Sequence, residues 1–372
     1  MSCQRLVLLL VVAGTTAAGP LRAQASAAAP VARASRAPVR VCAGGDVAVG
    51  TNLDTTWAVG RVAFGRRVAA LPDPAALVAP LAPLFAGADV ALINVEGAIG
   101  DGPAPRKCRR RSRQCYAIRQ VPGTEHALRG VAPDAVVVGN LANNHANDAG
   151  PAGFDETRRR LEAAGVQVTG ADTLATPVPL ASGDTLAVLG FGAWRSPSVL
   201  DLAAVRRHVS RAAAAWGRVV VTMHIGAEGA SARRTPARPE VFAGERRGNS
   251  VAFARAAAEG GASLVIGHGP HVLRGMEWVG GTLVAHSLGN LLTYGPFTLR
   301  GPNGRSAVLC TTLAPDGSVV ESTLFSTRQE PPGIVSRDPD AAALDDIRTL
   351  SALDFPATGV RVAADGGVTR RR

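Results

Sequence analysis

Five short apolar runs in this chain each lead to a side chain that can bind a metal ion. The runs cover residues 39–43, 90–93, 135–138, 219–222 and 264–266. The side chains that follow them are, in order, Asp46, Glu96, Asn144, His224, and the pair His268 and His271. Runs of this kind, bounded by glycine or turn residues, are typical of buried strands. Because ligands of open α/β sheets bind beyond the carboxyl ends of the strands, we predict that these side chains meet at one edge of a sheet.

The composition limits what can fill the core of this fold. Of the 372 residues, 47% are hydrophobic but only 4% are aromatic, so valine, leucine and alanine must build the interior. The length suits one large domain or two modest ones. Beyond the N-terminus no apolar run is long enough to span a bilayer.

The N-terminus has the features of an export signal. Arg5 supplies the positive charge, residues 6–13 form a short apolar stretch, and Ala23-Gln24-Ala25 is a cleavage site. Cleavage near Ala18 and an uncleaved membrane anchor are the alternatives. We predict a signal peptide at residues 1–25, a flexible leader at 26–38, and export to the periplasm, the cell envelope or the extracellular space.

The positive charge of the chain is local. The formal net charge is +11, yet two of the positive charges lie in residues 1–25 and six lie in residues 106–113. The chain has no aromatic stacking platform and no basic motif beyond that one segment. We therefore predict that it does not bind nucleic acid.

The cysteines do not predict a thiolate metal centre, because none has paired CxxC spacing. Cys108 and Cys115 bracket the basic segment and could close it as a small disulfide loop. Cys42 and Cys310 lie in strand-like runs, and we predict them to be buried apolar residues.

The order of expected elements predicts an α/β fold with mixed sheets and outer helices. Expected helices cover residues 72–85, 122–129, 152–164, 199–215, 249–259 and 340–353. Further strands are expected at residues 166–169, 185–191, 282–285, 307–312 and 319–325. The arginine- and proline-rich residues 230–247 are predicted to be a mobile loop that could act as a lid. We expect one domain at residues 39–326 and a C-terminal extension at residues 327–372.

Two motifs carry most of the expected chemistry. In Asn143-Asn144-His145, which follows a predicted strand, Asn144 can offer a carbonyl oxygen to a metal and His145 can donate a proton to a leaving group. The alternative for this motif is a hydrogen-bonded turn without a ligand. In Gly267-His-Gly-Pro-His271, a stiff turn lets His268 and His271 converge.

The expected donors are carboxylates, an amide oxygen and imidazoles, which suit one or two divalent ions of Mn, Fe, Zn or Mg. His286 is predicted to line the site rather than to bind the metal. The residues expected to contact substrate are Asn94, Glu228, Arg274, Ser287 and Asn290.

At these motifs the chain resembles the CapA family of capsule-synthesis proteins, whose fold is similar to that of the calcineurin-like metallophosphoesterases. The resemblance covers residues 39–326 and includes, in order, Gly45-Asp46, Asn94-Val-Glu96, the Asn143–Asp148 segment, His224-x-Gly-x-Glu228, Gly267-His-x-Pro-His271 and Ser287-Leu-Gly-Asn290. It implies a four-layer αββα sandwich and a role in making or anchoring an extracellular polymer such as poly-γ-glutamate.

The resemblance also implies roles for individual residues. Asp46 and His271 would bind a first metal, Glu96 would bridge two metals, and Asn144, His224 and His268 would bind the second. His145 would be the general acid. The chain departs from the phosphoesterase pattern after Asp46, where Val47-Ala48 replaces the usual x-His, and Arg274 and His286 also replace other residues.

Two functional hypotheses follow. The first is an exported metal-dependent hydrolase that acts on a phosphoester, or on a related acyl or amide bond of an envelope polymer, with His145, Asn144 and Asp46 in the catalytic machinery. The second is a non-catalytic protein that binds an anionic envelope polymer as the partner of a membrane synthase. The missing ligand after Asp46 keeps the second hypothesis open.

Overall fold

The computed structural model describes residues 37–49, 73–101, 116–172, 174–194, 198–295 and 297–371. The predicted signal peptide, nearly all of the predicted leader, and the segment from Cys108 to Cys115 lie outside these residues. Within the described part, no helix combines the length and hydropathy that crossing a membrane requires.

The first of two large mixed sheets contains the N-terminal strands. Its order is β18-β17-β16-β1-β2-β5-β6, and β15 also pairs with β1. The strands β1, β2, β5 and β6 run parallel to one another, whereas β16 and β17 are antiparallel to their neighbours. Their bounds are β1 Val39–Val49, β2 Val90–Val95, β5 Val136–Asn140, β6 Gln167–Thr169, β15 Asn290–Tyr294, β16 Arg305–Leu313, β17 Val319–Glu330 and β18 Ile334–Arg337.

The second large sheet has the order β13-β14-β12-β9-β8-β7. Its inner strands β8, β9, β12 and β14 are parallel, and β7 and β13 are antiparallel edges. The bounds are β7 Thr176–Pro179, β8 Thr185–Gly192, β9 Val219–His224, β12 Leu264–His268, β13 Met276–Val279 and β14 Thr282–Ala285.

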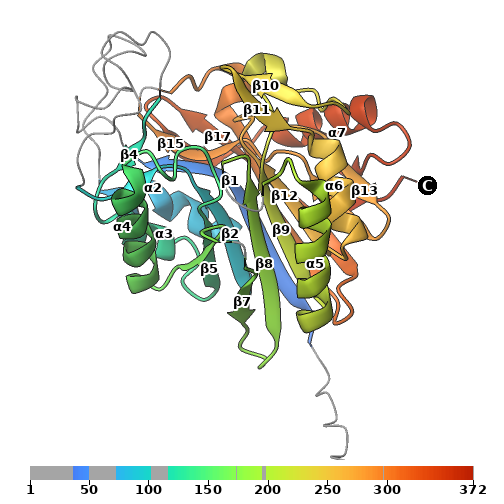
Figure 1. Ribbon diagram of the computed structural model, residues 1–372. Coiled ribbons are helices and arrows are strands. Elements are labelled where there is room, and N and C mark those ends of the chain that lie inside the picture. Colours follow the sequence, from blue (N-terminus) through green and yellow to red (C-terminus); the bar gives the residue numbers. More distant parts are fainter. Residues whose placement is uncertain are drawn as a thin grey trace, which may run out of the picture. The chain divides into compact units, whose positions relative to one another are not determined.

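Successive side chains of a strand point to opposite faces of the sheet, and this alternation explains the layers. On β2, Ala91 and Ile93 pack against the outer helices, whereas Val90 and Leu92 face the second sheet. A third apolar cluster, which includes Val221 of β9, joins the second sheet to its own helices. The four-layer αββα arrangement is thus confirmed (Figure 1).

Helices cover the outer face of each sheet. On the first sheet lie α2 (Pro74–Val78), the 3₁₀ helix η1 (Ala79–Leu84), α3 (Thr124–Arg129) and α4 (Gly150–Ala163). On the second sheet lie α5 (Leu202–Trp216) and α6 (Ser250–Glu259). The α6 helix is capped by Asn249, whose side chain accepts a hydrogen bond from the amide of Ala252 at 3.0 Å.

The segment predicted as a mobile loop at residues 230–247 is instead structured. It forms the 3₁₀ helix η2 (Ala230–Ala232) and a hairpin of β10 (Glu240–Phe242) and β11 (Glu245–Gly248). The hairpin turn places Ala243 and Gly244 at positive φ, which suits a two-residue connection. The prediction was wrong because the charged residues of this segment form buried ion pairs, a use that its composition does not indicate.

The expectation that Cys42 and Cys310 are only buried apolar residues was also wrong. Both are fully buried, but they form a disulfide. The antiparallel register of β1 and β16 places the two cysteines directly opposite each other. Their sequence separation of 268 explains why spacing did not reveal the pair.

The residues after Ser326 belong to the same compact unit as the sheets, which extends from Arg36 to Arg372. The strand β17 continues to Glu330 and pairs with β18, and α7 (Ala342–Asp354) packs into the core between the sheets. Short pairs complete the structure: β3 (Ala98–Ile99) with β4 (Arg119–Gln120), and β19 (Arg361–Val362) with β20 (Val368–Thr369).

Candidate metal centre

Strand register brings the expected residues to one edge of both large sheets. In the first sheet, Asn94 of β2 lies opposite both Asp46 of β1 and Asn140 of β5. In the second sheet, His268 of β12 lies opposite His224 of β9. Because parallel strands share the direction of their carboxyl ends, each sheet presents a row of polar side chains there.

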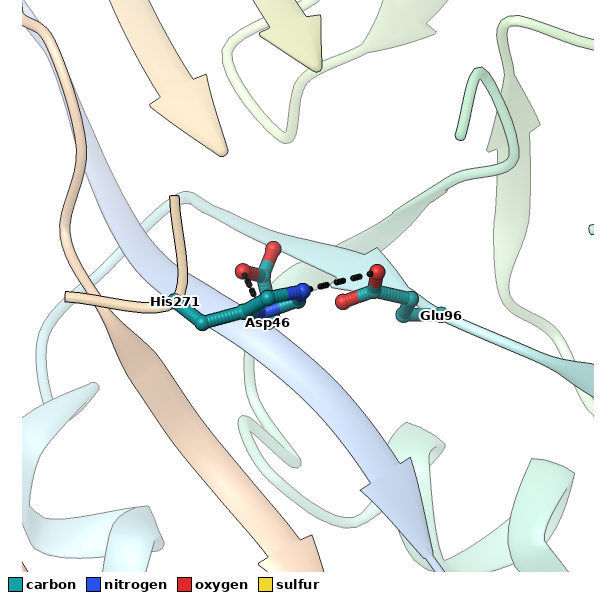
Figure 2. Close-up of side chains that lie close together, drawn as sticks. All are labelled: Asp46, Glu96 and His271. Atoms are coloured by element: carbon teal, nitrogen blue, oxygen red, sulfur yellow. Dashed lines mark ion pairs between the residues drawn. The ribbon is translucent and has the colours of Figure 1, made fainter. Parts of the chain in front are cut away.

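Asp46, Glu96 and His271 form the centre of this site. One ligand atom from each lies within 4.8 Å of the other two. His271 Nδ1 is 3.1 Å from Asp46 Oδ2, and its Nε2 is 3.5 Å from Glu96 Oε1. Figure 2 shows the imidazole pointing between the two carboxylates. Both carboxylates are buried, at 0% and 1% exposure, so they need a positive partner.

Two further histidines reach the same carboxylates. His268 Nδ1 lies 3.4 Å from Asp46 Oδ1, and His224 Nε2 lies 3.7 Å from Glu96 Oε1. The rings of His224 and His271 have centroids 6.5 Å apart, although the residues come from different segments. The structure therefore brings together five of the six residues that were expected to bind metal.

The donor set fits a divalent cation. Within the described residues, Glu96 Oε1, His224 Nε2 and His268 Nε2 are buried and have no hydrogen-bond partner. Buried polar atoms rarely remain unpaired because desolvating them costs free energy. Imidazole nitrogens and carboxylate oxygens are suitable ligands for Zn²⁺, Mn²⁺ and Fe²⁺. One or two cations at this cluster could give such buried atoms a partner.

Electrostatics support the same interpretation. Burial opposes ionisation of Asp46, but hydrogen bonding and charge interactions with His268 and His271 hold its pKa well below its usual value. Burial, aided by the charge of Asp46, raises the pKa of Glu96 well above its usual value. Burial also lowers the pKa of His224, whereas the nearby carboxylates outweigh burial and raise the pKa of His271. The carboxylates thus favour a positive charge at this position, which a bound cation would supply.

A network of amides holds Asp46 in place. The Asn94 side-chain amide donates to Asp46 Oδ1 at 2.8 Å, and Asn94 Oδ1 accepts from the Asn140 side chain at 2.8 Å. Asn143 donates to the same oxygen at 3.2 Å. Asn94 was expected to contact substrate, but it is fully buried and orients Asp46, a candidate metal ligand. Asn140, which closes β5, was not among the predicted site residues.

His145 is held by Asp148 on the turn after β5. His145 Nδ1 lies 2.6 Å from Asp148 Oδ2, and that oxygen also accepts from the Ile118 amide at 2.8 Å. The other ring nitrogen, Nε2, lies 4.0 Å from Glu96 Oε1. Asp148 thus fixes the ring and favours a proton on Nδ1. Asn144 lies on the same turn with a half-buried side chain.

A cleft of about 210 Å³ opens beside the cluster. Its polar lining includes Glu96, His145, Glu228, His271 and Asn290. Asn290 Oδ1 is 2.9 Å from His271 Nδ1, and Glu228 Oε2 is 3.7 Å from His271 Nε2. Glu228 and Asn290, both expected to contact substrate, therefore lie where a substrate can reach them.

Arg274 and Ser287 occupy different surroundings. The Arg274 guanidinium is fully buried and forms a two-point ion pair with Glu240, at 2.8 and 2.9 Å, so it anchors the β10–β11 hairpin and does not face the cleft. The Ser287 hydroxyl oxygen accepts from the Gly289 amide at 3.3 Å and shapes the turn before β15.

His286 belongs to a separate buried network and does not line the cleft. Its ring nitrogens contact the Ser250 hydroxyl and, at 3.2 Å, Glu277 Oε1, and the ring stacks on Phe355 with centroids 4.8 Å apart. The predicted lining role was therefore wrong, because these contacts hold the side chain in the core. The basic segment at residues 106–113 lies outside the described residues.

Comparison with known proteins relates the chain to capsule synthesis. Residues 40–294 match the family model described as bacterial capsule synthesis protein PGA_cap. The chain is 28% identical over 170 residues to the PGA biosynthesis protein CapA of Bacillus subtilis (strain 168), a match that covers 41% of each protein. The aligned part thus spans less than half of that relative.

Two solved structures are similar at low identity. One is a 5′-nucleotidase precursor from Thermus thermophilus, with a TM-score of 0.39 and 13% identity, covering 86% of this chain and 59% of that one. The other is the NAD nucleotidase NadN of Haemophilus influenzae, with a TM-score of 0.37 and 11% identity, covering 84% of this chain and 56% of that one.

Proposed function

Because the chain belongs to the bacterial capsule synthesis protein PGA_cap family, we propose that it is an exported, metal-dependent hydrolase that acts on a phosphoester during synthesis of an envelope polymer. The observation that carries this proposal is the buried cluster of Asp46, Glu96 and His271, which borders an accessible cleft. Buried acids and imidazoles beside a cleft are typical of hydrolytic metal sites.

Five side chains would hold one or two divalent ions: Asp46, Glu96, His224, His268 and His271. When bound, the metal would lower the pKa of water and stabilise negative charge on a phosphoryl group. Asn94 would keep the Asp46 carboxylate in the orientation that binding needs, since its amide donates to that carboxylate.

His145 is the proposed general acid. The residue lines the cleft, and Asp148 holds its Nδ1 while Nε2 lies on the side of Glu96. The protonated ring can therefore donate from Nε2 to a leaving oxygen without losing its orientation. Its distance of 4.0 Å from Glu96 keeps this proton beside the metal ligands.

Export is part of the proposal. The N-terminal charge, apolar stretch and cleavage site predict it, and the Cys42–Cys310 disulfide supports it. Disulfides persist in the periplasm and outside the cell, whereas the cytosol keeps thiols reduced. Poly-γ-glutamate or a similar envelope polymer as the product, and a membrane synthase as the partner, are further parts of this proposal.

The decisive experiment combines metal analysis with turnover. The purified chain without residues 1–25 is expected to contain Mn, Fe or Zn and to hydrolyse bis(p-nitrophenyl) phosphate or p-nitrophenyl phosphate. His271→Ala should lose both metal and turnover. His145→Ala should keep the metal but lose turnover on esters with poor leaving groups. His208→Ala is the control: this side chain lies partly exposed on α5, and its replacement should alter neither metal content nor turnover. A protein that binds no metal and cleaves neither ester would contradict the proposal.

One observation favours the second function, binding of an anionic polymer. Arg348, Arg361 and Arg371 line a groove of about 650 Å³ near the C-terminus. If this groove binds the polymer, retention of poly-γ-glutamate should persist in EDTA, weaken with salt, and fall when Arg361 is changed to Glu. Binding that is lost in EDTA and indifferent to salt would exclude the groove.

A further inference from the structure

The lining of the cleft combines two unlike kinds of side chain. Glu96, His145 and His271 line it together with the rings of Tyr116, Phe242 and Phe297. Only 4% of the chain is aromatic, so three rings around one small cleft are a marked concentration. Aromatic rings in a cleft that borders a candidate metal site can contact the body of a substrate whose charged group faces the metal.

Phe242 is supported by a contact with the buried guanidinium of Arg247. The guanidinium carbon of Arg247 lies 5.4 Å from the Phe242 ring centroid and 4.8 Å from that of Trp194. Arg247 is only 3% exposed, and its ion pair with Glu228 measures 2.6 Å. Cation–π contacts of this kind are strengthened when the cation is desolvated. One side of Phe242 is thus supported while the residue still lines the cleft.

The hairpin that carries Phe242 is anchored independently. The Arg274–Glu240 ion pair fixes β10 two residues before Phe242, and both partners are largely buried. The position of the ring therefore does not depend on a free loop. Phe242 is a preorganised contact, which reduces the entropy cost of binding.

The remaining apolar surface is tied to the proposed general acid. Phe297 packs against Ala48 and Ile118, which are buried. The amide of Ile118 donates to the same Asp148 oxygen that contacts His145. The apolar floor and the proton donor are consequently positioned by one carboxylate, so an apolar leaving group on this floor would lie close to His145.

We propose that the cleft selects phosphoesters whose leaving group carries a flat ring, and that Phe242 recognises this ring. The inference rests on the proposed function. The volume of about 210 Å³ is below the roughly 300–1,000 Å³ of sites for drug-sized ligands, so the cleft suits one phosphoryl group and one ring. A polymer segment would not fit within it.

Binding of two phosphonates tests the proposal without turnover. Phenylphosphonate should bind the Mn²⁺-loaded protein about tenfold more tightly than ethylphosphonate, as measured by calorimetry, since a ring contact contributes about 1 kcal/mol or more. Phe242→Ala and Phe242→Leu should remove most of this preference and leave ethylphosphonate binding within about twofold. Phe242→Tyr should restore it, because it keeps the ring.

The matched control is Val241→Ala, which changes a 62% exposed neighbour on the same strand and should leave both affinities unchanged. Equal affinity for the two phosphonates in the unchanged protein, with metal-dependent ester turnover present, would overturn the ring preference alone. A preference that survives Phe242→Leu would overturn the role of Phe242. Absence of both phosphonate binding and ester turnover would overturn the proposed function, and this inference with it.

Discussion

The Asp148→Asn substitution replaces a carboxylate whose Oδ2 lies 2.6 Å from His145 Nδ1 with a neutral amide of similar size. The same oxygen accepts a hydrogen bond from the Ile118 amide at 2.8 Å, and the carboxylate is buried. The variant can keep the Ile118 contact through its amide oxygen. The negative charge beside His145 Nδ1 is lost.

The size of the effect follows from that one contact. Hydrogen bonds to charged groups contribute about 1.5–3 kcal/mol. If this stabilisation acts on the proton-donating form of His145, kcat should fall by about 10- to 150-fold, because about 1.4 kcal/mol corresponds to a factor of ten. The loss should appear only when the leaving group needs a proton.

The assay is a series of aryl phosphoesters with leaving groups of graded acidity. For p-nitrophenol, a good leaving group, Asp148→Asn should change kcat little, whereas for phenol the full decrease should appear. Asp155→Asn on α4, an exposed acid, provides the control. Equal losses across the series would refute the role of Asp148 in proton donation, and unchanged metal content would show that the cluster remained intact.

Other predictions concern stability. Replacing Cys42 by Ser removes its disulfide with Cys310 and should cost about 2–5 kcal/mol, visible as a lower melting temperature that dithiothreitol reduces no further. Burial opposes ionisation of Glu277, but the hydrogen bond with His286 outweighs it and lowers the Glu277 pKa. Ionised Glu277 therefore contributes fully to the free energy of unfolding above its usual pKa of 4.5, and this contribution is lost as the pH falls through the lowered pKa. In Glu277→Gln the free energy of unfolding should depend less on pH in the acid range, and an unchanged slope would contradict this. Arg274→Met leaves a buried carboxylate on β10 unpaired and should cost about 3–5 kcal/mol in urea unfolding, a prediction that a loss below about 1 kcal/mol would contradict.

Much of the candidate site could be predicted because its residues follow a local rule. Asp46, Glu96 and His224 each end or follow a β-branched run, and such runs form strands whether or not their neighbours are known. The direction of parallel strands then places their ends at a common edge. The roles of Asn94 and Arg274 could not be assigned in this way, since both are decided by which groups surround them.

The hairpin at β10–β11 shows the same limit. Its arginines and prolines predicted an exposed loop, yet Arg247 is buried between two rings and pairs with Glu228. A charged side chain is buried only if a partner of opposite charge reaches it, and that partner comes from another part of the fold.

By itself the sequence determined most of the strands and the kinds of candidate metal ligand at their ends, because these depend on hydrophobic period and on residues next to each other in the chain. The αββα layering was predicted only through the family resemblance of the motifs. Only the tertiary structure decided that Cys42 pairs with Cys310, that Asp148 holds His145, and that aromatic rings line the same cleft as the candidate metal site. The first two depend on strand register and turn geometry, and the third on packing between distant segments. Each of these features requires that two residues lie close in space, and their separation along the chain does not determine this.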